Sequence, residues 1–143
     1  MKFQKLLMFS VLLLLLMGLA GCSSDEPEED RILIVTDRFF AQQMGSIQFD
    51  PESFFGRTLR YSGEIISMYW EPTGETLFHV GRPGDDCCGA GGIIGFTVYL
   101  NDIPPPADTA WVEVTGVFEE YYLRGFGYIS RVNAISVVER ERP

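Results

Sequence analysis

The residues best suited to chemistry lie in one glycine-rich segment that contains two adjacent cysteines, Cys87 and Cys88. Two aspartates come directly before them, and the single histidine of the chain lies a few residues upstream. Thiolate, imidazole and carboxylate groups are the usual ligands of protein-bound zinc, and thiolate and imidazole also suit copper. One interpretation is therefore a zinc or copper site whose ligands are Cys87, Cys88, Asp85, Asp86 and His79.

Three other interpretations of the cysteine pair stay open. Consecutive Cα atoms are about 3.8 Å apart, below the roughly 4.4 Å at which ordinary disulfides begin. A vicinal disulfide between Cys87 and Cys88 is therefore strained, easily reduced and suited to a redox switch. Alternatively, both thiols exchange with a partner, with Arg82 favouring the thiolate and the aspartates opposing it. The fourth interpretation is structural, with two small side chains in a tight turn.

Nothing else in the chain has the pattern of a catalytic site. His79 alternates with Phe78 and Val80, so we expect it to point outward from a strand. A catalytic histidine needs a nucleophile or an acid as its partner, and the motifs that supply one are missing. The Gly89–Gly92 run precedes a strand rather than a helix, which excludes a phosphate-binding loop. The sequence therefore predicts a protein that is not an enzyme.

The first 22 residues have the pattern of a bacterial lipoprotein signal peptide. Lys2 and Lys5 precede an apolar run over residues 6–20, which is shorter than the roughly 20 residues needed to cross a bilayer. Leu-Ala-Gly-Cys at residues 19–22 resembles the lipobox, after which the cysteine is acylated. We therefore expect acyl chains on Cys22 to anchor the protein to a lipid bilayer in the bacterial cell envelope, outside the cytoplasm.

The charge of the remaining chain excludes two classes of partner. Removal of residues 1–21, which makes Cys22 the first residue, removes both lysines and leaves nine arginines against 20 acidic residues, a formal charge of −11. Nucleic-acid binding and adsorption to anionic lipid both need clustered basic residues, so neither is expected. Residues 23–31 are acidic and lack an apolar side chain, which predicts a disordered tether.

The hydrophobic pattern after residue 56 is that of a β-protein. Alternating apolar residues and turn signals predict five strands, at 57–69, 76–82, 93–100, 110–119 and 128–138. Gly63 and Gly116 fall inside strands, where glycine permits the bends of a small closed barrel. We therefore expect a mainly β fold, a five-stranded OB-like barrel over residues 32–138, with a small β-sandwich as the alternative and a solvated tail at 139–143.

One or two short helices are expected before the barrel. Thr36 or Asp37 is a candidate cap for a helix over residues 39–44, whose apolar side comprises Phe39, Phe40, Gln43, Met44 and Ile47. Asp50, Pro51 and Gly56 mark the start and end of a second helical turn. Residues 32–35 are too short an apolar run to assign, and residues 101–108 can hold only a loop, where many OB barrels carry a helix.

Aromatic residues at the strand ends suggest a surface for a partner protein. Exposed aromatic side chains are enriched in protein interfaces, and two pairs meet this description. These are Tyr69, Trp70, Tyr121 and Tyr122.

The order of these features is similar to that of one known domain. Asp37-x-Phe39, Asp50 to Arg57, Phe78-x-Val80-x-Arg82, Cys87-Cys88 and Trp111-Val112-x-Val114-x-Gly116 follow one another in that order. This order resembles the OB-like C-terminal domain of bacterial permease accessory membrane proteins, a domain of unknown function, over about residues 32–138. The Arg-to-Cys-Cys element is the most specific part of the resemblance.

The resemblance implies a transport-associated accessory role. The family usually carries transmembrane helices before the domain, whereas here we expect a lipid anchor. It also usually has Ala and Asp soon after the cysteine pair, where this chain has Gly89, Ala90 and Gly91. We therefore expect a non-enzymatic binding or accessory module for a membrane protein such as a permease, and the alternative is a metal-handling or thiol-redox protein that uses Cys87 and Cys88.

Overall fold

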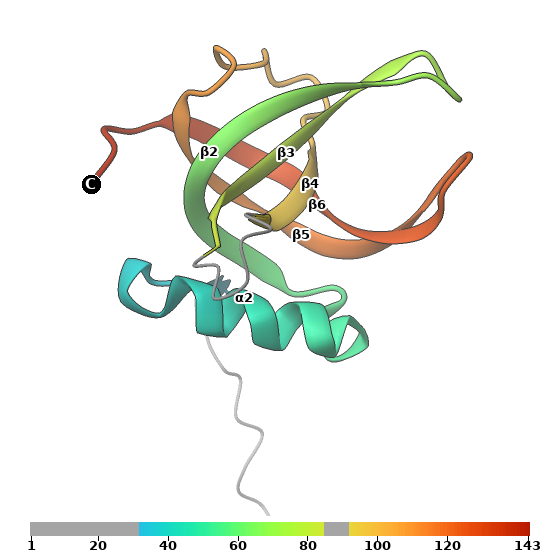
Figure 1. The fold of residues 1–143 in the computed structure, drawn as a ribbon. Helices are drawn as coiled ribbons and strands as arrows, with labels where there is room; N and C mark the ends of the chain where they lie inside the picture. Colours follow the sequence, from blue (N-terminus) through green and yellow to red (C-terminus); the bar gives the residue numbers. More distant parts are fainter. Residues whose placement is uncertain (1–31, 85–91) are drawn as a thin grey trace, which may run out of the picture.

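The structure, a computed structural model, describes residues 32–84 and 92–143. The predicted signal peptide, Cys22, the acidic tether and the segment from Asp85 to Gly91 lie outside the described residues. Six strands and one α-helix make up the domain (Figure 1). They are β1 (Ile32–Ile34), α2 (Phe40–Phe49), β2 (Thr58–Trp70), β3 (Glu75–Pro83), β4 (Ile93–Tyr99), β5 (Trp111–Leu123) and β6 (Gly127–Glu139).

Five of the strands form a closed barrel. The order is β2-β3-β4-β6-β5, and the pairing of β2 with β5 closes the sheet. Within the barrel, β4 and β6 are parallel through residues 97–99 and 131–133, and the other neighbours are antiparallel. This order confirms the predicted OB-like barrel. The alternative of a β-sandwich is wrong, because two separate sheets would lack the β2–β5 ladder.

The unassigned apolar run at residues 32–35 supplies a sixth strand. β1 runs parallel to the first residues of β2, with Ile32 beside Thr58 and Ile34 beside Arg60. Three residues are too few for a periodic pattern, so only the neighbouring strand reveals this element.

The glycines inside strands lie where backbones approach closely. β2 pairs with β5 through residues 58–64 and with β3 through residues 64–70, so it bends between them at Gly63. A Cβ atom on Gly63 would lie 2.6 Å from the carbonyl oxygen of Gly81, closer than real Cβ contacts. Gly116 lies at the register shift between β5 and β6, the mark of a β-bulge. The prediction that both glycines bend the barrel is therefore confirmed.

Helix α2 covers one end of the barrel (Figure 1). Phe40, Met44 and Ile47 are buried in the core, but Phe39 is 49% exposed and belongs to a short 3₁₀ turn at residues 37–39. The helix also continues to Phe49 rather than ending near Met44. The prediction that the helix begins at Phe39 and that Phe39 lies on its apolar side is therefore wrong. The 3₁₀ turn rotates this side chain away from the barrel.

The predicted helix cap is also wrong. Neither Thr36 nor Phe39, the residues that precede the two helical segments, makes a side-chain capping bond. Instead, the Oε1 atom of Gln43 accepts hydrogen bonds from the backbone N–H and the hydroxyl of Thr36, at 2.9 and 3.3 Å. The chain entering the helix is therefore fixed by a side chain seven residues further on, in the first turn of α2.

The predicted turn after Asp50 and the predicted loop before β5 agree with the structure, but β5 ends at Leu123 rather than at residue 119. A 3₁₀ turn covers residues 51–54, and Gly56 follows it with a φ of +82°, a conformation that favours glycine. Residues 100–110 between β4 and β5 contain no helix. Since α2 covers the barrel end from the N-terminal side, the core is closed without a helix at that position. The core residues are Val35, Phe40, Met44, Ile47, Leu59, Tyr61, Ile65, Val80, Phe96, Val98, Leu100, Val112, Val114, Phe118, Val132 and Ala134.

Candidate functional site

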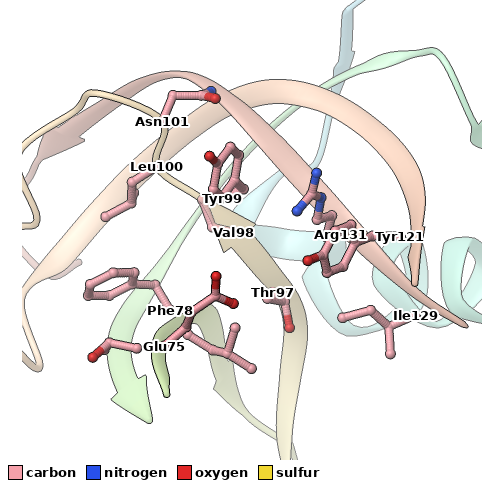
Figure 2. Close-up of a pocket in the computed structure, with 12 residues that line it drawn as sticks. Glu75, Phe78, Thr97, Val98, Tyr99, Leu100, Asn101, Tyr121, Ile129 and Arg131 are labelled. Atoms are coloured by element: carbon pink, nitrogen blue, oxygen red, sulfur yellow. The ribbon is translucent and has the colours of Figure 1, made fainter. Parts of the chain in front are cut away.

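A groove of about 490 Å³ opens over β4, between the first residues of β3 and the ribbon formed by β5 and β6 (Figure 2). Its walls mix apolar side chains with hydroxyl, carboxylate and guanidinium groups. The lining residues are Glu75, Thr76, Leu77, Phe78, Thr97, Val98, Tyr99, Leu100, Asn101, Tyr121, Ile129 and Arg131. This volume is in the usual range of small-molecule binding sites, which is about 300–1,000 Å³.

Strand pairing decides which side chains meet in the groove. Across the β5–β6 ribbon, Glu119 lies opposite Arg131 and Tyr121 lies opposite Ile129. Because side chains alternate along a strand, these four residues share one face of the ribbon. The parallel pairing of β4 with β6 places Tyr99 beside the same face. The groove therefore depends on the β5–β6 hairpin and on β4, a strand that ends at Tyr99, before the hairpin begins at Trp111.

Arg131 is the most constrained side chain of the groove. Its Nε atom donates a 2.7 Å hydrogen bond to Oε1 of Glu119. Its guanidinium carbon lies 3.7 Å from the centre of the Tyr121 ring and 4.7 Å from the centre of the Tyr99 ring. Figure 2 shows the guanidinium between these two rings, and the side chain is only 16% exposed. The plane of this cation is thus fixed by two aromatic contacts and one ion pair.

The end of β4 is fixed by Asn101. Its Nδ2 atom donates to Oδ1 of Asn133 at 2.6 Å and to the carbonyl oxygen of Ala134 at 3.0 Å. Asn101 also has a positive φ of 53°, which asparagine tolerates better than most residues. The amide group of Asn101 is therefore already engaged within the protein, and it shapes one end of the groove.

The two long hairpins are joined at their tips. Trp70, at the end of β2, donates from Nε1 to the carbonyl oxygen of Arg124 at 2.8 Å. Its ring also meets Phe126 edge to face, with 6.2 Å between the ring centres. Both hairpins extend from the same side of the barrel (Figure 1). The turn after β2 and the turn after β5 therefore behave as one connected unit.

The structure assigns different environments to the four residues predicted to form a partner surface. Tyr69 and Tyr122 are exposed, at 65% and 58%. Trp70 is half-buried against Phe126, and Tyr121 lies in the groove beneath Arg131. Tyr121 and Tyr122 are inside β5 rather than at its end, because the ribbon continues to Leu123. They therefore point to opposite faces of the ribbon.

Several aromatic residues add to this surface. Phe126 and Tyr128 are each 70% exposed, and Tyr128 packs edge to face on Tyr122 with 5.2 Å between ring centres.

Arg131, which lines the groove, and its ion-pair partner Glu119 were not predicted as site residues from the sequence. The observed register pairs Leu123 with Gly127 and therefore Glu119 with Arg131. Counting outward from the predicted turn at residues 124–127 would instead place Val132 opposite Glu119, so the sequence contains no usable signal for this pair.

His79 lies on β3, five residues before Gly84, between Ile66 of β2 and Thr97 of β4. It is half-buried, and this burial lowers the pKa of its imidazole below the usual value of 6.5. At about 3.3 Å per residue, His79 is roughly 17 Å along the strand from Gly84. Its role as a metal ligand stays a prediction, since the other four proposed ligands lie outside the described residues.

The two ends of the cysteine segment are held together. The N–H of Gly84 donates to the carbonyl oxygen of Gly92 at 2.8 Å, next to the paired residues Pro83 and Ile93. The vicinal disulfide, the thiol-exchange interpretation and the structural interpretation of Cys87 and Cys88 also stay predictions, because residues 85–91 are outside the described part.

Arg82, which precedes this segment, is engaged inside the domain. Its Nε donates to the carbonyl oxygen of Ser62 at 2.8 Å, and its terminal nitrogen pairs with Asp37. The guanidinium carbon lies 4.2 Å from the ring centre of Phe40 and 5.0 Å from that of Trp111. Arg82 thus ties the helical segment to the barrel, and its charge is already matched by Asp37.

Two findings concern only residues 32–84 and 92–143. No helix among them has the length and the apolar character needed to span a membrane. No group of three or more His, Cys, Asp or Glu side chains gathers there in a way that could hold a metal ion.

Comparison with known proteins gives one match. A family model described as the DUF1980 C-terminal domain covers residues 22–143. Searches among curated proteins and solved structures found no match to this chain.

Proposed function

Since this chain belongs to the DUF1980 C-terminal domain family, which has no characterised function, we propose that it is a non-enzymatic binding module. In this proposal, acyl chains on Cys22 hold the barrel at a bacterial membrane, outside the cytoplasm. Its partner is a membrane protein such as a permease, and the module contributes contacts rather than a chemical step.

The observation that carries this proposal is the aromatic surface of the two joined hairpins. Tyr69, Tyr122, Phe126 and Tyr128 are each more than half exposed, although soluble domains bury most large aromatic side chains. Aromatic residues are enriched in protein interfaces because they bury a large area with few rotatable bonds. The bond between Trp70 and Arg124 holds this surface in a defined arrangement before a partner binds.

The length of chain before the barrel supports a partner in or near the membrane. Ten peptide units separate Cys22 from Ile32, and they extend at most about 36 Å. An acyl anchor on Cys22 would therefore keep the domain close to the bilayer. A membrane protein with loops or domains outside the bilayer is within reach of the hairpins.

Site-specific photo-crosslinking tests this proposal. A benzophenone amino acid placed at Tyr69 or Tyr122 should capture a multi-span membrane protein in intact cells. The matched control carries the same amino acid at Phe49, which is 93% exposed but lies on α2 at the covered end of the barrel (Figure 1). Equal capture from Phe49, or no membrane protein captured from the hairpin positions, would contradict the proposal.

The second candidate is a metal-handling or thiol-redox role for Cys87 and Cys88. The bond between Gly84 and Gly92 favours it, because it holds the two ends of the cysteine segment together. Intact mass and elemental analysis of the native protein should then show zinc, copper or a mass 2 Da below the dithiol form, one disulfide bond. A Cys87→Ala/Cys88→Ala variant serves as the control. A metal-free protein with two stable, unreactive thiols would exclude this role.

A further inference from the structure

We propose that the groove is a binding site for a carboxylate attached to a compact apolar group, with Arg131 as the residue that holds the carboxylate. This inference deepens the proposed binding role, on which it rests. It concerns the groove over β4 rather than the exposed aromatic surface of the hairpins.

The hydrogen-bonding capacity of Arg131 is the first argument. A guanidinium has five N–H groups, and the Nε–H of Arg131 is used by Glu119. The four terminal N–H groups have no hydrogen-bond partner among residues 32–84 and 92–143. Because the side chain is only 16% exposed, water can solvate these donors only in part. They belong to a residue that lines the groove, where a ligand can accept their hydrogen bonds.

The fixed orientation of Arg131 is the second argument. An arginine that is free to rotate must lose rotamer freedom before it donates two parallel hydrogen bonds to one ligand. Here Tyr99 and Tyr121 hold the guanidinium between them, and Glu119 sets its rotation through Nε. The two terminal nitrogens of the guanidinium are therefore already oriented to donate parallel hydrogen bonds. The two oxygens of a carboxylate match this planar geometry.

The surrounding charges favour a carboxylate over a phosphate. Glu75 lines the groove and Glu119 borders it, so among the described residues that line or border the groove Arg131 is the single cation beside two carboxylates. The described residues contain no lysine, because both lysines of the chain are at positions 2 and 5. A dianionic phosphate would meet more repulsion than attraction here. Arg131, Glu75 and Glu119 together have a formal charge of −1, to which a carboxylate adds one negative charge and a phosphate dianion adds two, so the carboxylate meets less repulsion.

The apolar walls determine what the carboxylate is attached to. Leu77, Phe78 and Ile129 line the groove, and Figure 2 shows Phe78 and Ile129 on opposite sides of β4. These side chains offer contacts to an aliphatic or aromatic body and no hydrogen bonds. Such a ligand is either a small organic acid or the C-terminal residue of a peptide, which present the same carboxylate chemistry.

Matched pairs of probes test the inference on the full chain, purified in detergent. The first pair is 3-phenylpropanoate and 3-phenylpropanamide. The second pair is an acetylated peptide that ends in phenylalanine, with a free or an amidated C-terminus. We expect each acid to bind and its amide to bind at least tenfold more weakly, measured by NMR titration. Preference between the two acids distinguishes the small-molecule source from the peptide source.

Substitutions at Arg131 identify the residue responsible. Arg131→Gln should weaken the binding of the acid about 10- to 100-fold, the usual range for losing a charged hydrogen bond. Arg131→Lys should retain only part of the binding, since lysine keeps the charge but lacks the planar guanidinium that donates two parallel hydrogen bonds. The control is Arg140→Gln, which makes the same change of charge at an arginine that pairs with Glu113 and does not line the groove. Circular dichroism melts of the three variants check that each one folds.

Three outcomes would overturn the inference. They are equal binding of acid and amide, unchanged binding in Arg131→Gln, and tighter binding of phenyl phosphate than of 3-phenylpropanoate. Photo-crosslinking from Tyr122 is measured in the same variants. Capture of a membrane protein that persists while the acids fail to bind would leave the proposed function standing and refute only the carboxylate site.

Discussion

The indole Nε1 atom of Trp70 donates a 2.8 Å hydrogen bond to the backbone carbonyl oxygen of Arg124, 54 residues away in the sequence. This bond joins the tip of the β2–β3 hairpin to the tip of the β5–β6 hairpin. The ring of Phe126 packs against the same indole. Two hairpins that could move independently are thereby held as one surface.

We expect Trp70→Phe to lower the free energy of unfolding by about 1 kcal/mol, because it keeps an aromatic ring but removes the hydrogen bond. Amide hydrogen exchange at Phe126, whose N–H bonds to the carbonyl oxygen of Leu123, should also accelerate as the tip loosens. Phe49→Leu on the exposed side of α2 is the control. Unchanged exchange at Phe126 would show that the Trp70–Arg124 bond does not hold the tips together.

The close contact between the tips predicts different costs at two neighbouring glycines. Gly125 and Gly127 both have positive φ, at +87° and +117°, so alanine is strained at either position. A Cβ on Gly125 would also lie 2.8 Å from Pro72, whereas nothing lies within 4 Å at Gly127. Gly125→Ala should therefore be the more destabilising by about 1 kcal/mol or more in chemical denaturation. Equal losses would mean that the contact with Pro72 adds nothing.

Replacing Arg82 should destabilise the domain clearly, because this arginine is largely buried. Its side chain is 14% exposed and joins Ser62, Asp37 and the rings of Phe40 and Trp111. Arg82→Gln should cost about 2–3 kcal/mol of unfolding free energy, because it removes a charged hydrogen bond and two ring contacts. Asp37→Asn should cost less than 1 kcal/mol, since Asp37 is 66% exposed and water replaces much of the interaction. Guanidinium denaturation of both variants measures the difference, and similar losses would contradict the assigned role.

The buried hydroxyl of Tyr61 predicts a specific alkaline behaviour. It has no hydrogen-bond partner among the described residues, and burial raises the pKa of the phenol far above its usual value of 10. The folded state therefore keeps a proton that the unfolded chain releases above pH 10. Unfolding free energy should fall with rising pH there, by up to about 1.4 kcal/mol per unit from this group.

Tyr61→Phe isolates this contribution. The variant should be as stable as the parent or about 1 kcal/mol more stable at pH 7, because it removes an unpaired buried polar group. Above pH 10 its advantage should grow by the slope given above. Denaturation curves at pH 7, 10 and 11 provide the measurement, and parallel pH profiles for the two proteins would refute the burial argument.

His79 predicts an acid sensitivity of opposite sign. Burial lowers the pKa of its imidazole, so the unfolded chain takes up a proton near pH 6.5 before the folded chain does. The unfolding free energy is therefore unaffected by His79 above pH 6.5. Below pH 6.5 it decreases, and the decrease continues until the pH reaches the lower pKa of the folded state. Its neighbours Ile66 and Thr97 carry no charge that would offset the effect. His79→Gln should flatten the decline between pH 7 and 5, and an NMR titration that placed the folded pKa at or above 6.5 would contradict it.

The strand positions could be predicted from the sequence because alternation is a local property of the chain. Alternation along the strand predicted at residues 57–69 places Leu59, Tyr61 and Ile65 on one face, and all three are buried in the barrel. The mid-strand glycines, the turn at residues 124–127 and the resemblance over the whole domain also follow from residue types and their order. These features need no knowledge of which strands become neighbours.

The tertiary structure alone decided where the groove lies and what it contains. Arg131 meets Tyr99 only because β6 runs parallel to β4, and it meets Tyr121 only through the register of the β5–β6 ribbon. The strand at residues 32–34 likewise depends on its pairing with β2, more than 20 residues further along the chain. Periodicity specifies which face of a strand is buried, but contacts between distant strands are set by their pairing, and one sequence pattern is compatible with several pairings.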